Sequence, residues 1–135
     1  MEELIYKFEN GLLKSSEWHH NEHIAITFWY LENYDELNAI VKIKAGLLRY
    51  NQIYKTPQGD GRGYHETITM FFIKLAQSFI AENSHLRGSS SLLASKFIEE
   101  NPRHLETLKK HYRSETLRSV EARIHWVEPD LVPIP

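Results

Sequence analysis

Three histidines lie within five positions of the sequence, directly before a run that is almost wholly apolar. They are His19, His20 and His23, in the segment SEWHHNEHIAITFWYL. A second segment, GYHETITMFF, places His65 and Glu66 before another apolar run. Imidazole is a common ligand of Zn, Fe, Ni and Cu ions, and a positioned carboxylate is a common general base. The two segments together therefore indicate a histidine cluster that binds a metal.

Helix geometry selects three of these side chains as metal ligands. Residues three or four positions apart share one face of a helix, so His20 and His23 point the same way. His65 begins the apolar face of the second segment. We predict that His20, His23 and His65 bind one divalent metal ion (Zn, Fe, Mn, Ni or Cu), as side chains from facing helices do in helical bundles. Glu66 lies ~100° around the helix from His65 and is predicted to be a general base; as a ligand it would complete a two-histidine, one-carboxylate iron site.

Two classes of function fit this pattern, and the sequence leaves both open. In the first, the protein is a metal-dependent enzyme, in which Tyr64 and Arg123 orient a small polar substrate. In the second, it is a non-catalytic module whose histidines line a polar pocket for a small molecule or a partner. A helix-start histidine is also often just solvated, which is the role expected for His19, although a register that pairs His19 with His23 remains open. The other histidines lie among polar residues and are not assigned to the site: His85, His104, His111 and His125.

The elements that must position these residues are predicted to be helices. No segment alternates between polar and apolar residues with the period of a strand, whereas helical spacing recurs along the chain. We predict an all-α, single-domain bundle of about four main helices plus short ones, over residues 1–135. The main helices are expected at 1–14, 15–34, from 35 onward, and 64–83.

Local signals define the boundaries of these helices. Ser15 or Ser16 is predicted to cap the second helix, and Asp35 the third. The third helix is expected to bury a set of aliphatic residues: Leu37, Ile40, Val41, Leu47 and Leu48. The glycine-rich segment 55–63 predicts a loop. Short helices are expected before Pro102, from Pro102 to Tyr112 and at 114–123, followed by an extended proline-rich tail over the surface.

Composition excludes several classes of protein and partner. The chain has 135 residues, of which 41% are hydrophobic and 12% aromatic, and its formal net charge is −2. This charge gives no basic surface for nucleic acid or an anionic membrane. There is no cysteine, so thiolate chemistry is excluded. The segment MEELIYKFEN lacks the apolar core of a signal peptide, and we expect a cytoplasmic protein.

The two histidine segments also resemble those of a set of small bacterial proteins of uncharacterised function. In these, a tryptophan and a His-x-x-His-Leu motif open one apolar helix, and GYHETxT opens another. A C-terminal stretch similar to SxEARxxWVEPDLxPxP corresponds to residues 119–135, so the resemblance covers most of the chain. It departs from the pattern at His19, where threonine is expected, and at Ile24, where leucine is expected. The resemblance implies a shared site and no particular chemistry; the matching residues are Trp18, His20, His23, Gly63, Tyr64, His65, Glu66, Thr67 and Thr69.

Overall fold

The computed structural model describes residues 1–59 and 62–135. The regular structure in these residues consists of eight α-helices and two short 3-10 helices, with one isolated bridge between Gly59 and Arg62. The all-α prediction is therefore confirmed. The predicted loop at 55–63 has no helix in its described part, and residues 60 and 61 lie outside the described residues. No helix of the described chain is both long enough and apolar enough to cross a membrane.

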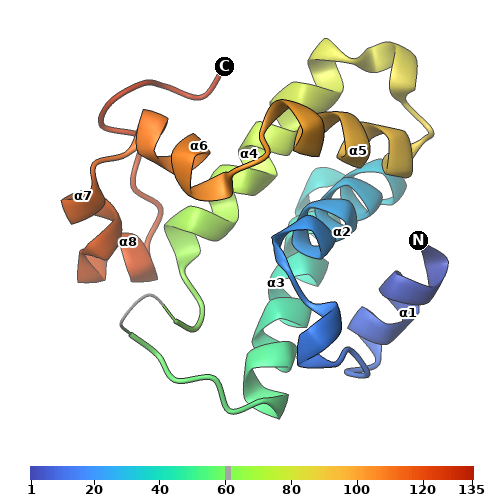
Figure 1. Cartoon of the computed structure of the whole chain (residues 1–135), viewed down its shortest axis with the longest axis horizontal. Helices are drawn as coiled ribbons and strands as arrows, with labels where there is room; N and C mark the ends of the chain where they lie inside the picture. The colour runs from blue at the N-terminus through green and yellow to red at the C-terminus, as the bar shows by residue number, and fades with distance from the viewer. Residues whose placement is uncertain (60–61) are drawn as a thin grey trace.

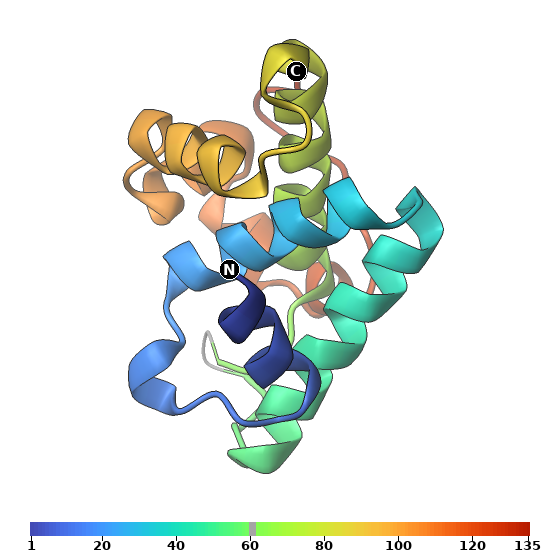
Figure 2. The ribbon, with the colours of Figure 1, turned by 90° about the vertical axis from the view of Figure 1, so that its right-hand side faces the viewer.

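Helices α1, α3, α4 and α5 pack around a central α2, and α8 packs against α4 (Figures 1 and 2). The bounds of the helices are α1 Glu2–Glu9, α2 His20–Asn33, α3 Glu36–Ile53, α4 Glu66–Glu82, α5 Ser90–Glu100, α6 His104–His111, α7 Ser114–Arg118 and α8 Val120–Ile124. The 3-10 helices span Ser15–Glu17 and Ser84–Leu86. The expected helix at 15–34 is thus two elements, and the expected helix at 114–123 is also two.

Helix α2 is buried on two sides, because it belongs to two hydrophobic clusters. Its residues Ile24 and Phe28 pack with residues of α4, α5 and α6. Ile26 and Tyr30 pack with residues of α1, α3 and α4. Figure 2 shows this arrangement, with α2 crossing the middle of the molecule, α5 above it and α1 below it. Burial on both sides explains why the sequence of α2 is apolar nearly all round.

Helix α3 begins at the predicted cap but buries a different face from the predicted one. Asp35 accepts a hydrogen bond from the Asn38 amide at 2.8 Å. Three of the residues predicted to be buried are instead exposed: Leu37 (73%), Val41 (55%) and Leu48 (52%). The buried face carries Ala39, Ile43 and Gly46.

The reason is a close approach between α1 and α3 at Gly46. A Cβ atom added to Gly46 would lie 2.0 Å from Cζ of Phe8, so the aromatic ring occupies the space of a side chain. Ala39, the other small residue on this face, is fully buried. The face of α3 is therefore selected by small residues that admit neighbouring side chains, rather than by its largest aliphatic residues.

The C-terminal segment after α8 is held against α4 and α6. Residues 126–135 form no helix or strand. The buried hydroxyl of Thr67 donates to the carbonyl of His125 at 2.7 Å and accepts from the Val127 amide at 3.1 Å. The Tyr112 hydroxyl donates to the Val127 carbonyl at 2.6 Å, and the Leu131 amide donates to the carbonyl of His111 at 3.0 Å. Figure 1 shows this segment running beside α4 and α6 to the C-terminus.

Candidate functional site

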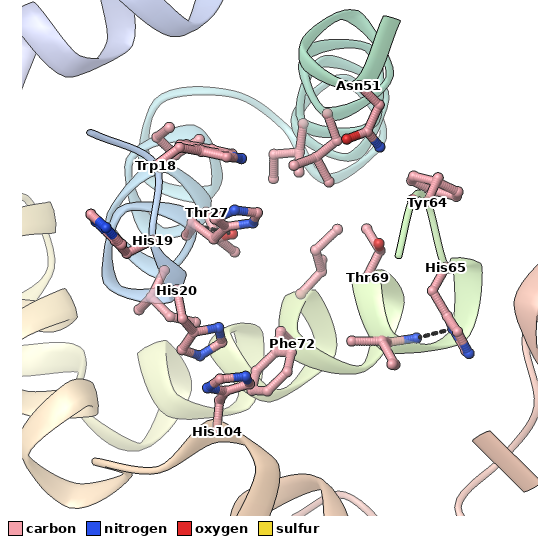
Figure 3. Close-up of a pocket in the computed structure, with 18 of the residues that line it drawn as sticks. Trp18, His19, His20, Thr27, Asn51, Tyr64, His65, Thr69, Phe72 and His104 are labelled. Carbon is pink, nitrogen blue, oxygen red and sulfur yellow. Dashed lines mark hydrogen bonds between the residues drawn. The ribbon is translucent and has the colours of Figure 1, made fainter. Parts of the chain in front are cut away.

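A cavity of about 440 Å³ lies between the two hydrophobic clusters (Figure 3). All the predicted site residues except Glu66 line it. Its walls come from α1, α2, α3, α4, α6 and α8. The aliphatic and aromatic part of the lining is Phe8, Trp18, Ile24, Ile26, Ile43, Leu47, Ile68, Phe72 and Ile73. The polar part is His19, His20, His23, Thr27, Asn51, Tyr64, His65, Thr69, His104 and Arg123, together with Gly63.

One side of the cavity is formed by stacked aromatic rings around His20. The imidazoles of His20 and His104 stack with their centroids 4.1 Å apart and their planes inclined by 21°. Phe72 packs against His20 with a centroid separation of 4.9 Å. Figure 3 shows His20 and His104 side by side, with Phe72 next to them. This packing joins α2, α4 and α6 at one end of the cavity.

His23 lines the same cavity from the next turn of α2. Its ring stacks on Trp18 at a centroid distance of 3.8 Å, and Trp18 stacks in turn on Phe8 at 5.4 Å. His23 is only partly exposed, because its ring lies deep in the molecule and faces the cavity. The ring is therefore held in place by aromatic packing rather than by a hydrogen bond.

Three of the histidines that line the cavity have ring nitrogens without a hydrogen-bond partner among the described residues. In residues 1–59 and 62–135, the imidazoles that form hydrogen bonds are those of His19, His65 and His111. His20, His23 and His104 form none. No side-chain nitrogen or oxygen of these residues is both fully buried and unpartnered, so the free ring nitrogens open onto the cavity, where water or a ligand can bond to them.

Burial also keeps two of these rings uncharged at neutral pH. Burial, with a smaller contribution from the neighbouring imidazole of His104, lowers the pKa of His20 to about 4. Burial, with smaller contributions from His20 and His104, lowers the pKa of His23 to about 3. A neutral imidazole presents one N–H donor and one acceptor nitrogen. This end of the cavity therefore offers hydrogen bonds of both kinds without a formal charge.

His65 lies on the opposite side of the cavity from His20 and is engaged by both ring nitrogens (Figure 3). Its Nδ1 accepts from the Ile68 amide at 3.1 Å, so His65 caps the N-terminus of α4. Its Nε2 donates to the carbonyl of Leu117 at 2.7 Å. Burial lowers its pKa, and the positive charge of Arg123 adds to this effect, against the hydrogen bond to Leu117. The structure thus brings His20 together with His104, and it does not bring His65 to them.

Glu66 lies behind Tyr64 rather than in the lining of the cavity. The Tyr64 hydroxyl donates to Glu66 Oε1 at 2.6 Å, and Lys44 Nζ donates to Oε2 at 2.8 Å. Burial raises the pKa of Glu66, but the hydrogen bonds from Lys44 and Tyr64 outweigh it and leave the pKa below its usual value. A carboxylate held ionised in this way is a weak base and is well placed to fix the Tyr64 hydroxyl.

The main chain of Tyr64 is fixed by two long side chains. Its amide donates to Gln58 Oε1 at 2.7 Å, and its carbonyl accepts from Arg123 Nη1 at 3.0 Å. Gly63 has a φ of +84°, and a Cβ there would lie 1.9 Å from the same Gln58 oxygen. The flexible Gln58 side chain could move aside, so the glycine of the GYHET segment is favoured by its left-handed φ and by the Pro57 carbonyl, 2.8 Å from the added Cβ.

The start of α2 differs from the prediction, because His19 rather than a serine is its N-cap. The His19 amide donates to Glu22 Oε1 at 3.2 Å, and its ring Nδ1 lies 2.8 Å from the same oxygen. His19 is exposed and committed to this contact with Glu22. In this register His20 and His23 are the two α2 histidines whose rings have no partner in residues 1–59 and 62–135.

His104 is the site residue that sequence reasoning missed. It begins α6 and lies in a polar segment, NPRHLETL, which contains no second histidine and no apolar run. Nothing local distinguishes it from a solvated residue; only the packing of α6 against α2 and α4 brings it to the cavity. Within the described residues, no group of three or more His, Cys, Asp or Glu side chains is placed to hold a metal ion.

Comparison with known proteins adds no relative: no family model, curated protein or solved structure matches this chain.

Proposed function

We propose that the protein binds one small molecule in the cavity between α2, α3, α4 and α6. The observation that carries this proposal is the set of three imidazoles, His20, His23 and His104, which face the cavity without partners in the described part of the chain. A ligand that supplied those hydrogen bonds would take the place of water at these accessible nitrogens.

The size and lining of the cavity support a small molecule rather than a protein partner. Ligand pockets are typically concave spaces of roughly 300–1,000 Å³ with apolar walls and a few placed polar groups. The cavity measures about 440 Å³, and its lining combines aliphatic side chains such as Ile24, Ile68 and Ile73 with a few polar groups. The ligand class that fits is a molecule with an apolar middle and polar groups at its ends.

Fragment screening by two-dimensional amide NMR would test binding in the cavity. We expect hits to shift the amide signals of Thr69 and Ile68 and the indole signal of Trp18. A Thr69→Phe variant, which fills the cavity, should lose these shifts, because Thr69 lines it. The matched control Gln77→Phe lies on the same helix outside the lining and should keep them. Hits that bind Thr69→Phe as well as they bind the natural protein would contradict the proposal.

A metal-dependent function remains a prediction with its own test. His20 and His23 have unpartnered nitrogens within the described residues, whereas His65 would have to give up its hydrogen bond to Leu117 or its cap on α4 to become a ligand. Elemental analysis of protein purified without a histidine tag, with a thermal shift on adding Zn, Fe, Mn, Ni or Cu, tests it. A bound metal should raise the melting temperature by linkage; no metal and no shift would exclude it.

If a reaction takes place in this cavity, Tyr64 and Arg123 are the groups available to it near His65, on the side opposite His20. Both line the cavity, and Arg123 is bonded to the Tyr64 carbonyl. Glu66 then acts through Tyr64, as a positioning residue that keeps the hydroxyl oriented. This assignment replaces a general base at Glu66 with the Tyr64 hydroxyl oxygen, which can accept a hydrogen bond because its one hydrogen is donated to Glu66.

A further inference from the structure

Within residues 1–59 and 62–135, only one nitrogen of the Arg123 guanidinium, Nη1, forms hydrogen bonds with the protein. Its Nη1 donates to the carbonyl of Arg62 at 2.9 Å and to that of Tyr64 at 3.0 Å. These two bonds engage both hydrogens of Nη1. A guanidinium has five N–H donors in a rigid fork, so Nε and Nη2 remain. That pair of nitrogens forms an edge of the kind that binds a carboxylate through two parallel hydrogen bonds.

Among residues 1–59 and 62–135, no acidic side chain lines the cavity to compete for this edge. In the described part of the chain, its lining includes one arginine, five histidines and no aspartate or glutamate. Two carboxylates contact lining residues from outside the lining: Glu66 is bound by Lys44 and Tyr64, and Glu22 by His19. The lining therefore carries one fixed positive charge, at Arg123, and an anionic group would neutralise it.

The opposite end of the cavity has a different character. His20 stacks on His104, and His23 stacks on Trp18, so their rings are fixed with free donor and acceptor nitrogens. Because burial keeps His20 and His23 neutral, an anion there would require costly protonation. This end suits a neutral hydroxyl, amide or ring nitrogen.

We infer that the ligand is a small carboxylic acid, whose carboxylate binds Arg123 and whose neutral hydrogen-bonding group lies among His20, His23 and His104. An apolar, preferably planar, segment joins the two groups and packs against residues such as Ile68 and Phe72. The inference rests on the proposed function and narrows it to one ligand class. It makes Arg123 the residue that determines specificity.

Three related probes test each end of the ligand separately. They are para-coumarate, its primary amide para-coumaramide, and cinnamate, which lacks the hydroxyl. Calorimetric titration should show that para-coumarate binds about 10- to 100-fold more tightly than the amide, the usual difference between a charge-assisted and a neutral hydrogen-bonding pair. Cinnamate should bind more weakly than para-coumarate, because it leaves the histidine end unpaired.

Variants then connect the preference to Arg123. In Arg123→Gln the advantage of the acid over the amide should disappear, whereas in the exposed control Arg118→Gln it should persist. Arg123→Lys keeps the charge but not the fork and should retain part of the preference. Equal affinity for acid and amide in the natural protein, a measurement that needs no variant, would overturn the inference.

The remaining outcomes separate this inference from the proposed function. If screened fragments occupy the cavity but none of the three probes does, the carboxylate inference is overturned and small-molecule binding stands. If neither fragments nor probes bind, both are overturned. Equal binding of cinnamate and para-coumarate would overturn the assignment of the neutral group to the histidines.

Discussion

His20 and His23 are the side chains whose burial makes the fold sensitive to acid. Their pKa values of about 4 and about 3 in the folded protein lie below the ordinary value of 6.5. The unfolded chain therefore binds more protons than the folded chain between those values, and the free energy of unfolding falls as the pH drops. We expect a loss of about 2 kcal/mol between pH 7 and pH 5, discounted for the partial exposure of His20.

Urea denaturation across this pH range measures the effect. The double variant His20→Gln, His23→Gln should flatten the dependence of the unfolding free energy on pH above about pH 5. The exposed His85→Gln serves as the control and should leave the dependence as it is. A natural protein equally stable at pH 7 and pH 5 would show that the two rings are not buried in the neutral form.

Tyr64 and Glu66 are expected to act as one unit. Tyr64→Phe and Glu66→Ala each remove the 2.6 Å hydrogen bond between them, and each should cost about 1–2 kcal/mol of unfolding free energy. The double variant should cost clearly less than the sum, with a coupling energy of about 1 kcal/mol. A thermodynamic cycle from chemical denaturation measures this coupling, and strict additivity would argue against the pairing.

For individual residues, the sequence pattern identifies some of the histidines that line the cavity and does not identify others. His20 and His23 stand out because they precede an apolar run at helical spacing, and both line the cavity. His65 stands out in the same way, yet it caps a helix and bonds to Leu117, which lies 52 positions away. His104 has no local signal at all. Which ring nitrogens remain unpaired depends on tertiary contacts that local spacing does not encode.

At the level of secondary structure, His65 acts as the N-cap of α4. His65→Ala removes the bond to the Ile68 amide and the bond to Leu117, and should cost about 2 kcal/mol. His65→Asn keeps a good capping side chain but is too short for Leu117, so it should cost about half as much. Thermal or urea unfolding of the two variants checks the order. Equal losses would show that the cap contributes little.

Gly46 sets the distance between α1 and α3. Gly46→Ala gains helix propensity but places a methyl group within the ring of Phe8, and overpacking of this kind typically costs about 1–3 kcal/mol. Because Phe8 also stacks on Trp18, the variant should change the near-ultraviolet signal of the tryptophans. Ala45→Gly, one position along the same helix, is the control and should cost only its propensity, about 1 kcal/mol.

The presence of the helices could be predicted from the sequence. Which face of a helix is buried, and which residue begins it, could not always be predicted. Asp35 is a strong local cap, and it begins α3 as expected. The buried face of α3 could not be predicted from hydrophobicity. Leu37 is as hydrophobic as a core residue yet is exposed, and the residue that determines the buried face is Gly46. The cap of α2 could not be predicted either, since serine is a better capping residue than His19.

The stability of the whole molecule is expected to depend on the contact between α4 and the C-terminal segment. Thr67→Val keeps the shape of the side chain but leaves the His125 carbonyl and the Val127 amide without their partner. We expect a loss of about 2–3 kcal/mol in unfolding free energy. Thr27→Val is a matched control, because the buried Thr27 hydroxyl bonds only to a carbonyl of its own helix, and it should cost less than 1 kcal/mol. Similar losses in the two variants would refute a special role for Thr67.

The walls of the cavity come from distant parts of the sequence, and this determines when the cavity forms during folding. Helices form within about a microsecond from neighbouring residues, whereas Phe8 and Arg123 line one cavity from distant parts of the sequence. We expect the cavity to be absent from the folding transition state and to close on the downhill side of the barrier. A bound ligand should therefore slow unfolding in stopped-flow experiments while leaving the refolding rate unchanged, so occupancy would lengthen the lifetime of the native state rather than hasten its formation.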